Sequence, residues 1–177
     1  TFFSFFTLIP SILIAAFSLF LFSFALEKYL DNKITTAVNN SYELAKNYVN
    51  DVRNKVEADI ILIAFDTNKS ANFLNDNTNE YLRFLRTQKL IRDVDEIHLI
   101  DSSGNLIIST LDDRQTFTQP SEEALEMVFA EERPLKIINA FENRSAAILK
   151  LNNYIDTYLY VVKFLDEKIS NYLTESK

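Results

Sequence analysis

Four side chains offer the best chemistry for binding a small polar or anionic ligand: His98, Arg144, Tyr158 and Tyr160. An imidazole, a guanidinium and two phenols can all form directional hydrogen bonds. Successive side chains of a strand point to opposite faces, so Tyr158 and Tyr160 share one face of a strand-like run at residues 157–165, and His98 shares a face with Glu96 in residues 94–100. We therefore predict a ligand pocket that contains these four residues and lies against a sheet.

A second interpretation of the same residues is structural. One histidine and two tyrosines within strands also suit half-buried packing with satisfied hydrogen bonds. His98, the single histidine of the chain, could in addition respond to pH, because an unperturbed imidazole titrates near about 6.5. The sequence leaves these alternatives open.

Three acidic pairs are further candidates for binding: Asp112-Asp113, Glu122-Glu123 and Glu131-Glu132. Such pairs could bind divalent cations, or meet an anionic bilayer through those cations. They equally suit solvated surfaces and the first turns of helices, where the dipole favours negative charge. We predict no metal site from them.

The composition excludes several kinds of site. With one glycine, one histidine and no cysteine in 177 residues, the chain cannot build a glycine-rich phosphate loop, a two-histidine zinc motif or a disulfide framework. The net charge of −7 argues against a nucleic-acid partner, since phosphate binding requires clustered cations. We expect no catalytic residues within these 177 residues.

The amino-terminal residues predict a membrane anchor. Residues 2–26 contain no charged side chain and no histidine, and about twenty apolar residues suffice to cross a bilayer as a helix. A cleaved signal peptide is the alternative, but no small-residue cleavage pattern follows the run. We therefore expect residues 1–26 to form a transmembrane helix.

Residues 27–68 predict a long signalling helix that continues from the span. They lack glycine and proline, and apolar residues recur every three or four positions, for example at Val52, Val56, Ile60 and Ile63. Asp51 and Lys55 interrupt a strict heptad. We expect this helix to pack mainly on its own domain, with dimer contacts near the membrane.

The order of the later elements predicts an α+β domain over residues 69–165. Polar residues 67–78 indicate a loop, residues 79–91 a short helix, and residues 94–100 and 106–110 a hairpin with Gly104 in its turn. A helix at 120–130 and strands at 135–141, 145–151 and 157–165 follow, joined by short turns that imply antiparallel neighbours. Residues 166–177 would begin a helix that leads to a second span outside the chain. Five antiparallel strands with flanking helices, after a transmembrane helix that continues into a long helix, match the plan of PAS-like and Cache-like sensor domains.

Several stretches resemble the amino-terminal region of the NtrY family of nitrogen-regulation sensor histidine kinases. They are the run from Ile9-Pro10-Ser11 to Ser18, the segment Leu26-Glu27-Lys28-Tyr29-Leu30, the run Ala58-Asp59-Ile60 to Ala64, and Asp156-Thr157-Tyr158-Leu159-Tyr160-Val161 followed by Asp166. These stretches are spread over most of the chain. None of them is a catalytic motif.

The resemblance implies a receptor of the bacterial inner membrane with residues 27–177 on the extracytoplasmic side. A second span, a HAMP linker, a cytoplasmic PAS domain and a kinase core would follow. The family implies a homodimer that autophosphorylates from ATP and Mg²⁺ and transfers the phosphoryl group to a response regulator, NtrX. No cofactor is expected within this chain, and His98 is not the expected phosphoacceptor. A small-molecule ligand is one candidate for the signal.

Two other functions fit the same element order. The domain could sense a ligand for a chemoreceptor or for a cyclic-dinucleotide enzyme. It could also be a membrane-anchored adaptor that has no enzymatic output and binds no ligand.

Overall fold

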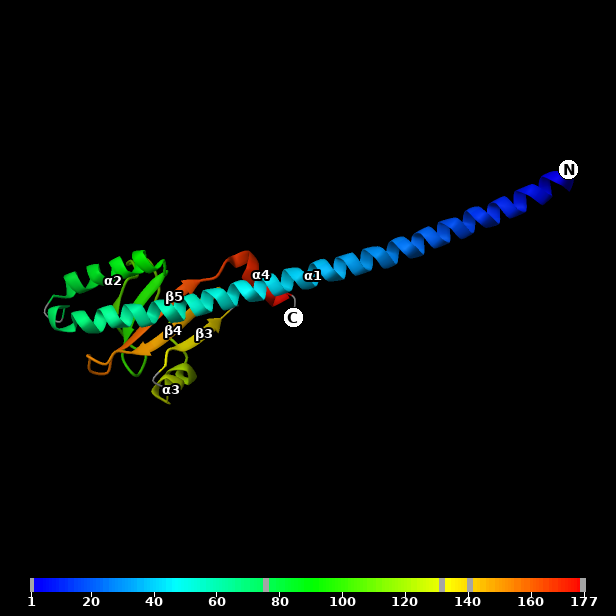
Figure 1. Ribbon diagram of the computed structural model, residues 1–177. Coiled ribbons are helices and arrows are strands. Elements are labelled where there is room, and N and C mark those ends of the chain that lie inside the picture. The colour runs from blue at the N-terminus through cyan, green and yellow to red at the C-terminus, as the bar shows by residue number, and fades with distance from the viewer. Residues whose placement is uncertain (1, 75–76, 131–132, 140–141, 176–177) are drawn as a thin grey trace. The chain divides into compact units, whose positions relative to one another are not determined.

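The computed structural model describes residues 2–74, 77–130, 133–139 and 142–175, and the chain divides into two units, Thr1–Leu44 and Ala45–Lys177. The predicted α+β class is confirmed (Figure 1). The elements in chain order are α1 (Phe2–Leu74), α2 (Thr78–Arg92), β1 (Glu96–Ile100), β2 (Leu106–Ser109), α3 (Glu122–Ala130), β3 (Leu135–Asn139), β4 (Arg144–Lys150), β5 (Tyr158–Phe164) and α4 (Glu167–Glu175).

The first unit is the amino-terminal part of α1. Its side chains from Leu8 to Leu44 are all exposed, including large apolar ones such as Ile14 and Phe20 at 67% and 66%. Among the described residues, one helix is long and apolar enough by length and composition to cross a membrane, with a mean hydropathy of 2.3 in its most apolar window. The unit therefore carries an apolar surface that the chain itself does not cover.

Helix α1 continues into the region predicted as a loop, residues 67–78. The prediction of a loop there was wrong for residues 67–74, which are helical; residues 75 and 76 lie outside the described part of the chain. The polar residues that suggested a loop make hydrogen bonds instead. The Thr67 hydroxyl donates to the Ile63 carbonyl at 2.6 Å, and the Asn68 side-chain oxygen accepts from the Asn153 amide at 3.1 Å.

The five strands form one antiparallel sheet in the order β2-β1-β5-β4-β3. The predicted hairpin at residues 94–110 is confirmed as β1 and β2, and the three later strands fall where their runs predicted. Residues 140 and 141 of the predicted 135–141 strand lie outside the described residues. The central position of β5 places its residues between β1 and β4, which is where the predicted site residues meet.

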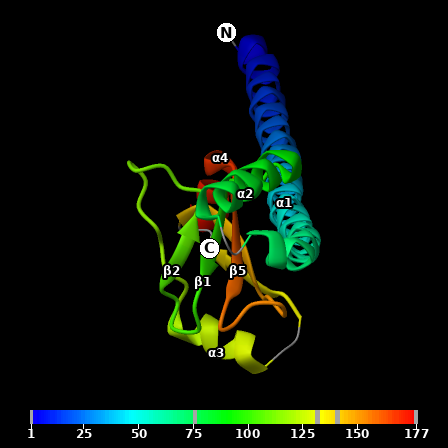
Figure 2. The same ribbon diagram turned by 90° about the vertical axis from the view of Figure 1, so that its left-hand side faces the viewer.

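The two faces of the sheet are covered by different elements (Figure 2). We call the side that packs against α1 and α2 the α1 face, because Val56, Ile60 and Ile63 of α1 and Leu85 of α2 share one apolar cluster with it. We call the other side the α3 face, because Leu125 and Val128 of α3 share a second cluster with it. Both faces of the central strands are therefore buried.

The single glycine lies where the prediction placed it, in the turn of the β1–β2 hairpin. Gly104 has a φ of +78°, and a Cβ atom there would come within 2.6 Å of the Gln119 side-chain nitrogen. The Asp101 carboxylate accepts hydrogen bonds from the Ser103 and Asn105 amides and so closes the turn. Both the backbone angle and the close approach of Gln119 require glycine at this position.

Hydrogen bonds hold α1 at both ends of its course through the second unit. At one end the Asp166 amide, just before α4, donates to the Tyr48 hydroxyl at 3.1 Å. At the other end the Tyr154 hydroxyl donates to the Thr67 carbonyl at 3.1 Å. Between them, Lys136 of β3 forms an ion pair of 2.8 Å with Glu57. Helices α1 and α4 consequently lie together beside Tyr48 (Figure 1).

Candidate functional site

The sheet register brings three of the four predicted site residues to one region of the α3 face. His98 of β1 lies directly opposite Tyr160 of β5. Arg144 begins β4 opposite Phe164, on the far side of β5 from His98. Tyr158 is on the same face but lies opposite Ile100, toward the other end of the strands. The predicted set is therefore divided into a group of three and a separate tyrosine.

Glu96 links the group of three. Its two carboxylate oxygens lie 3.0 Å from His98 Nε2 and 3.5 Å from Arg144 Nη2. The Glu96 side chain is only 5% exposed, and an ionised carboxylate is stable in such a place only with a cation or several donors beside it. Arg144 supplies the cation. We call Glu96, His98, Arg144 and Tyr160 the polar cluster.

His98 is fully enclosed and fully hydrogen-bonded. Its Nδ1 lies 2.9 Å from the Ser109 hydroxyl, whose oxygen also accepts from the Leu111 amide at 3.0 Å. We assign a neutral imidazole whose Nε2–H donates to Glu96 and whose Nδ1 accepts from Ser109, because this tautomer satisfies all three groups. Both ring nitrogens are then engaged within the protein. This arrangement is the one that the structural interpretation of His98 predicts.

Aromatic rings close over the imidazole. The ring of Phe117, from the segment between β2 and α3, lies 5.0 Å from that of His98, and the Tyr160 ring lies 5.5 Å away on β5. Burial raises the pKa of the Tyr160 phenol, an effect that the nearby Arg144 charge opposes. Tyr160 therefore remains neutral and able to donate a hydrogen bond.

Arg144 is the member of the cluster with donor capacity to spare. Its Nη1 is buried and has no hydrogen-bond partner among the described residues. Its guanidinium carbon lies 5.5 Å from the centre of the Phe164 ring. A guanidinium with an unused donor can bind a carboxylate or another anionic group. Anion binding at Arg144 is thus the chemistry that this cluster can perform.

Tyr158 lies apart from the polar cluster. Its ring packs edge-to-face on Phe129 of α3 with the centroids 5.5 Å apart. Burial raises the pKa of its phenol, and the Asp156 carboxylate raises it further. Tyr158 also lines a groove of about 850 Å³ whose walls come from α1, α3 and the end of β4. It would therefore serve a different site from the one that contains His98.

The acidic pairs do not meet one another in the described part of the chain. Asp112 lies 3.9 Å from Arg86 in an exposed ion pair, and Glu122 and Glu123 occupy the first turn of α3. Glu131 and Glu132 lie outside the described residues. Within those residues no three His, Cys, Asp or Glu side chains are grouped to hold a metal ion.

Sequence reasoning did not include Glu96, Ser109 and Phe117 in the site. Glu96 carried a usable signal, because it shares the strand face of His98 and a carboxylate on a buried face needs a cationic partner. Ser109 and Phe117 reach His98 from β2 and from the segment that follows it. Nothing in their local sequence distinguishes them from ordinary strand and loop residues.

These observations define a class of protein: an α+β domain that follows a helix apolar enough to cross a membrane, with a buried polar cluster in its sheet. The sequence matches the NtrY N-terminal region over residues 1–177. The chain belongs to this family, and the resemblance noted from the sequence is confirmed.

Similar proteins carry names that agree with this family. A putative sensor histidine kinase, NtrY-like, of Rickettsia conorii is 26% identical over 97% of the chain, and the nitrogen regulation protein NtrY of Azorhizobium caulinodans is 20% identical over 94% of it. The chain spans only 28% and 22% of the lengths of these two relatives. No solved structure matches the chain.

Proposed function

We propose that this chain is the extracytoplasmic sensor domain of a membrane-bound sensor histidine kinase of the nitrogen-regulation type. The observation that carries the proposal is that the match to the NtrY N-terminal region extends over residues 1–177 and so includes both the apolar helix and the α+β domain. The names of the relatives favour a histidine kinase as the output of the longer protein. They favour this output over a chemoreceptor, a cyclic-dinucleotide enzyme or an adaptor.

The packing of α1 supports a role in signalling. Val56, Ile60 and Ile63 are at most 1% exposed and form part of the core under the sheet. A ligand that favours one of two arrangements of this core would displace α1, because packed interfaces change between discrete arrangements. We propose that α1 carries the displacement toward the membrane.

The remaining parts of the proposal concern the longer protein. Helix α4 would lead to a second span, and the hydrogen bond from the Asp166 amide, just before α4, to Tyr48 of α1 supports this. The five-stranded sheet with flanking helices supports a PAS-like or Cache-like sensor domain. A homodimer in the bacterial inner membrane, with an ATP- and Mg²⁺-dependent kinase core, would phosphorylate a response regulator of the NtrX type. The chain itself would supply no catalytic group, and a small anion at Arg144 is the signal that the polar cluster could bind.

Cysteine labelling of the whole protein in intact cells tests the location of the domain. The chain has no cysteine, and Ile155 is 96% exposed, so Ile155→Cys introduces one accessible thiol without disturbing the core. We expect a membrane-impermeant maleimide to label this variant in intact cells, after passage through an outer membrane made permeable to it.

The matched control is the same protein without the added cysteine, which reports labelling of any thiol elsewhere in the longer protein. A second sample is labelled after lysis to show that the thiol is reactive. Labelling that appears only in lysed cells would place the domain in the cytoplasm and contradict the proposal.

A further inference from the structure

We propose that the groove beside Tyr158 binds a small organic anion with an aromatic body, such as an arylalkanoate. We call it the corner groove. It has a volume of about 850 Å³, within the range of small-molecule sites. The described residues that line it include residues from α1 (Ile61, Ala64, Phe65), from α3 and the segment after it (Phe129, Arg133), and from β4 and β5 (Lys150, Tyr158).

The groove exists because β3 is shorter than its partner at this end. The first residue of β3, Leu135, pairs with Ile148 of β4. The last residues of β4, which include Lys150, still pair with β5 on their inner side, where Lys150 lies opposite Tyr158. On the other side of β4, these last residues have no pairing partner in β3. A corner of the sheet is therefore left open between α1 and α3.

Apolar and aromatic side chains form the walls of the corner groove. Phe65 and Phe129 are 66% and 52% exposed, and Ile61 is 48% exposed. Phe129 and Tyr158 already pack edge-to-face, and the aromatic ring of a ligand could pack against them in the same way. An aromatic ligand would remove this apolar surface from water, which is favourable in proportion to the area covered.

The described lining residues of the corner groove include two cations. Among its described lining residues, Arg133 and Lys150 are the charged side chains and none is an Asp or Glu; Glu131 and Glu132, which precede Arg133, lie outside the described residues. Such a lining is unusual in a chain with a net charge of −7. Neither cation forms an ion pair with a carboxylate in the described part of the chain. A guanidinium and an ammonium favour an anion over a cationic ligand of the same shape.

The corner groove also contacts the helix to which the proposed function gives the signalling role. Four of its lining residues belong to α1, including the buried Ala64 at 4% exposure. A bound anion would thus touch α1 directly. The use of this site as a signal rests on the proposed function, whereas binding itself does not.

A tryptophan placed in the groove gives a direct binding measurement. The chain has no tryptophan, so Phe65→Trp provides a single reporter at an exposed lining position. Residues 1–177 with this substitution, in lipid nanodiscs, are titrated with 3-phenylpropionate and separately with 3-phenylpropylamine, which has a similar body and the opposite charge. We expect a saturable change in tryptophan emission with the carboxylate and none with the amine.

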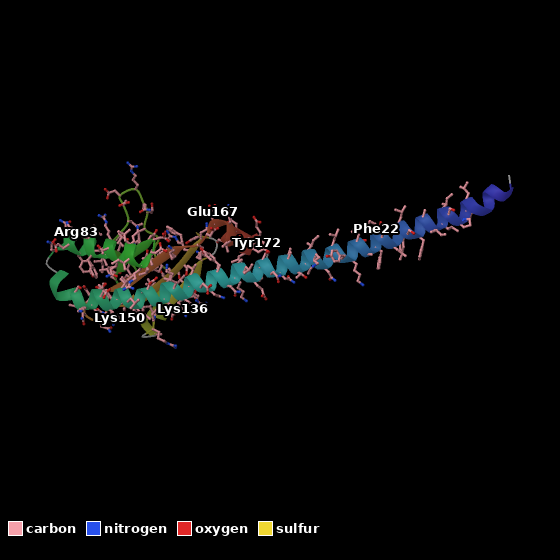
Figure 3. All side chains as sticks on the ribbon, turned by 45° about the horizontal axis from the view of Figure 1, so that its top comes forward. Phe22, Arg83, Lys136, Lys150, Glu167 and Tyr172 are labelled. Atoms are coloured by element: carbon pink, nitrogen blue, oxygen red, sulfur yellow. The ribbon has the colours of Figure 1, made fainter. Side chains whose placement is uncertain are left out.

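Charge-removing variants of the reporter protein locate the anion. Lys150→Gln and Arg133→Gln should each weaken binding of 3-phenylpropionate about tenfold, as expected for the loss of one charge-assisted hydrogen bond. Arg83→Gln is the matched control, because Arg83 is exposed on α2 and lies well apart from Lys150 (Figure 3). It should leave the affinity unchanged. Thermal melts of all variants confirm that each is folded.

Several results would overturn the inference. They are equal binding of the amine, unchanged affinity in both charge-removing variants, or no saturable response up to roughly 10 mM probe. Emission that depends on protein concentration and not on the probe would show that a second copy of the chain fills the groove instead. None of these results bears on the labelling of Ile155→Cys, so failure of this inference is distinguishable from failure of the proposed function.

Discussion

The two faces of the sheet use the same strands for different purposes. On the α1 face, β1 and β5 contribute Ile97, Leu99, Leu159 and Val161, all of them apolar and at most 2% exposed. On the α3 face the alternating positions include Glu96, His98 and Tyr160, which are nearly as well buried. The two faces therefore do not differ in burial; they differ in the polarity of the buried side chains.

The difference teaches where the stability and the polar chemistry of the domain reside. Apolar residues on the α1 face gain free energy simply by leaving water. Polar residues on the α3 face lose their hydrogen bonds to water and must replace them with hydrogen bonds within the protein. Their burial therefore contributes little stability and depends on a complete hydrogen-bond network. Substitutions on the two faces should consequently lower the free energy of unfolding for different reasons.

The largest effect is expected from Ile60→Ala on the α1 face. Ile60 is fully buried in the cluster that α1 shares with the sheet, and removing such a side chain leaves a cavity. We expect the free energy of unfolding to fall by about 2–5 kcal/mol. Equilibrium urea denaturation followed by far-ultraviolet circular dichroism measures this change.

Leu62→Ala is the matched control for Ile60→Ala. Leu62 lies two residues away on the same helix but is 44% exposed, so its truncation should cost well under half as much. If the two variants lost equal stability, the α1 face would not be the main source of stability.

A smaller loss is expected from Glu96→Gln on the α3 face. The substitution keeps the shape of the side chain and removes the charge that balances Arg144, whose Nη2 lies 3.5 Å away. We expect a loss of about 2–3 kcal/mol in the free energy of unfolding, mostly from the unbalanced cation. The same denaturation measurement applies, with Glu126→Gln as an exposed control on α3. A variant as stable as the parent would show that Glu96 is not the partner that stabilises Arg144.

The smallest effect is expected from Asp93→Asn, which removes an exposed carboxylate that forms ion pairs with α1 and β5. Lys55 of α1 and Lys163 of β5 each lie 3.2 Å from one Asp93 carboxylate oxygen, and their hydrogen bonds hold the pKa of Asp93 below its ordinary value. Because the pKa is lower in the folded state, the stabilisation is present above the unfolded value of 3.8 and is lost as the pH falls through the folded value.

Asp93→Asn should therefore lower the melting temperature at pH 7 by no more than about 3 °C, since exposed pairs are weak. The difference from the parent should vanish in acid below the folded pKa. Asp51→Asn, also exposed on α1, serves as the control. A difference that persisted at low pH would show that the carboxylate charge is not responsible.

The sequence was sufficient to predict which strand residues share a face. The period of two in a strand is independent of context, so Glu96 and His98 share one face of β1, and Tyr158 and Tyr160 share one face of β5. The turn at Gly104 could be predicted as well, since its conformation is set by local geometry. Predictions that depend on strand period and turn chemistry were thus confirmed.

Features that depend on distant contacts could not be predicted. Thr67 and Asn68 suggested a loop by composition, yet Tyr154 and Asn153 bind them from 87 and 85 residues away and the helix continues. The corner groove depends on where β3 begins relative to β4, which is a matter of register between strands. Similarly, the separation of Tyr158 from His98 required the pairing of β1 with β5 to be known.

The attachment of α1 at Tyr48 and at Thr67 has a mechanical consequence. Tyr48 and Thr67 are two outer supports of this segment, and the Lys136–Glu57 ion pair lies between them in sequence, so sliding α1 along its axis would strain all three contacts together. The supports are 19 residues apart in sequence, or about 28 Å at the usual rise of about 1.5 Å per residue. A sideways step of about 1 Å at one support would therefore turn the segment by only about 2° about the other.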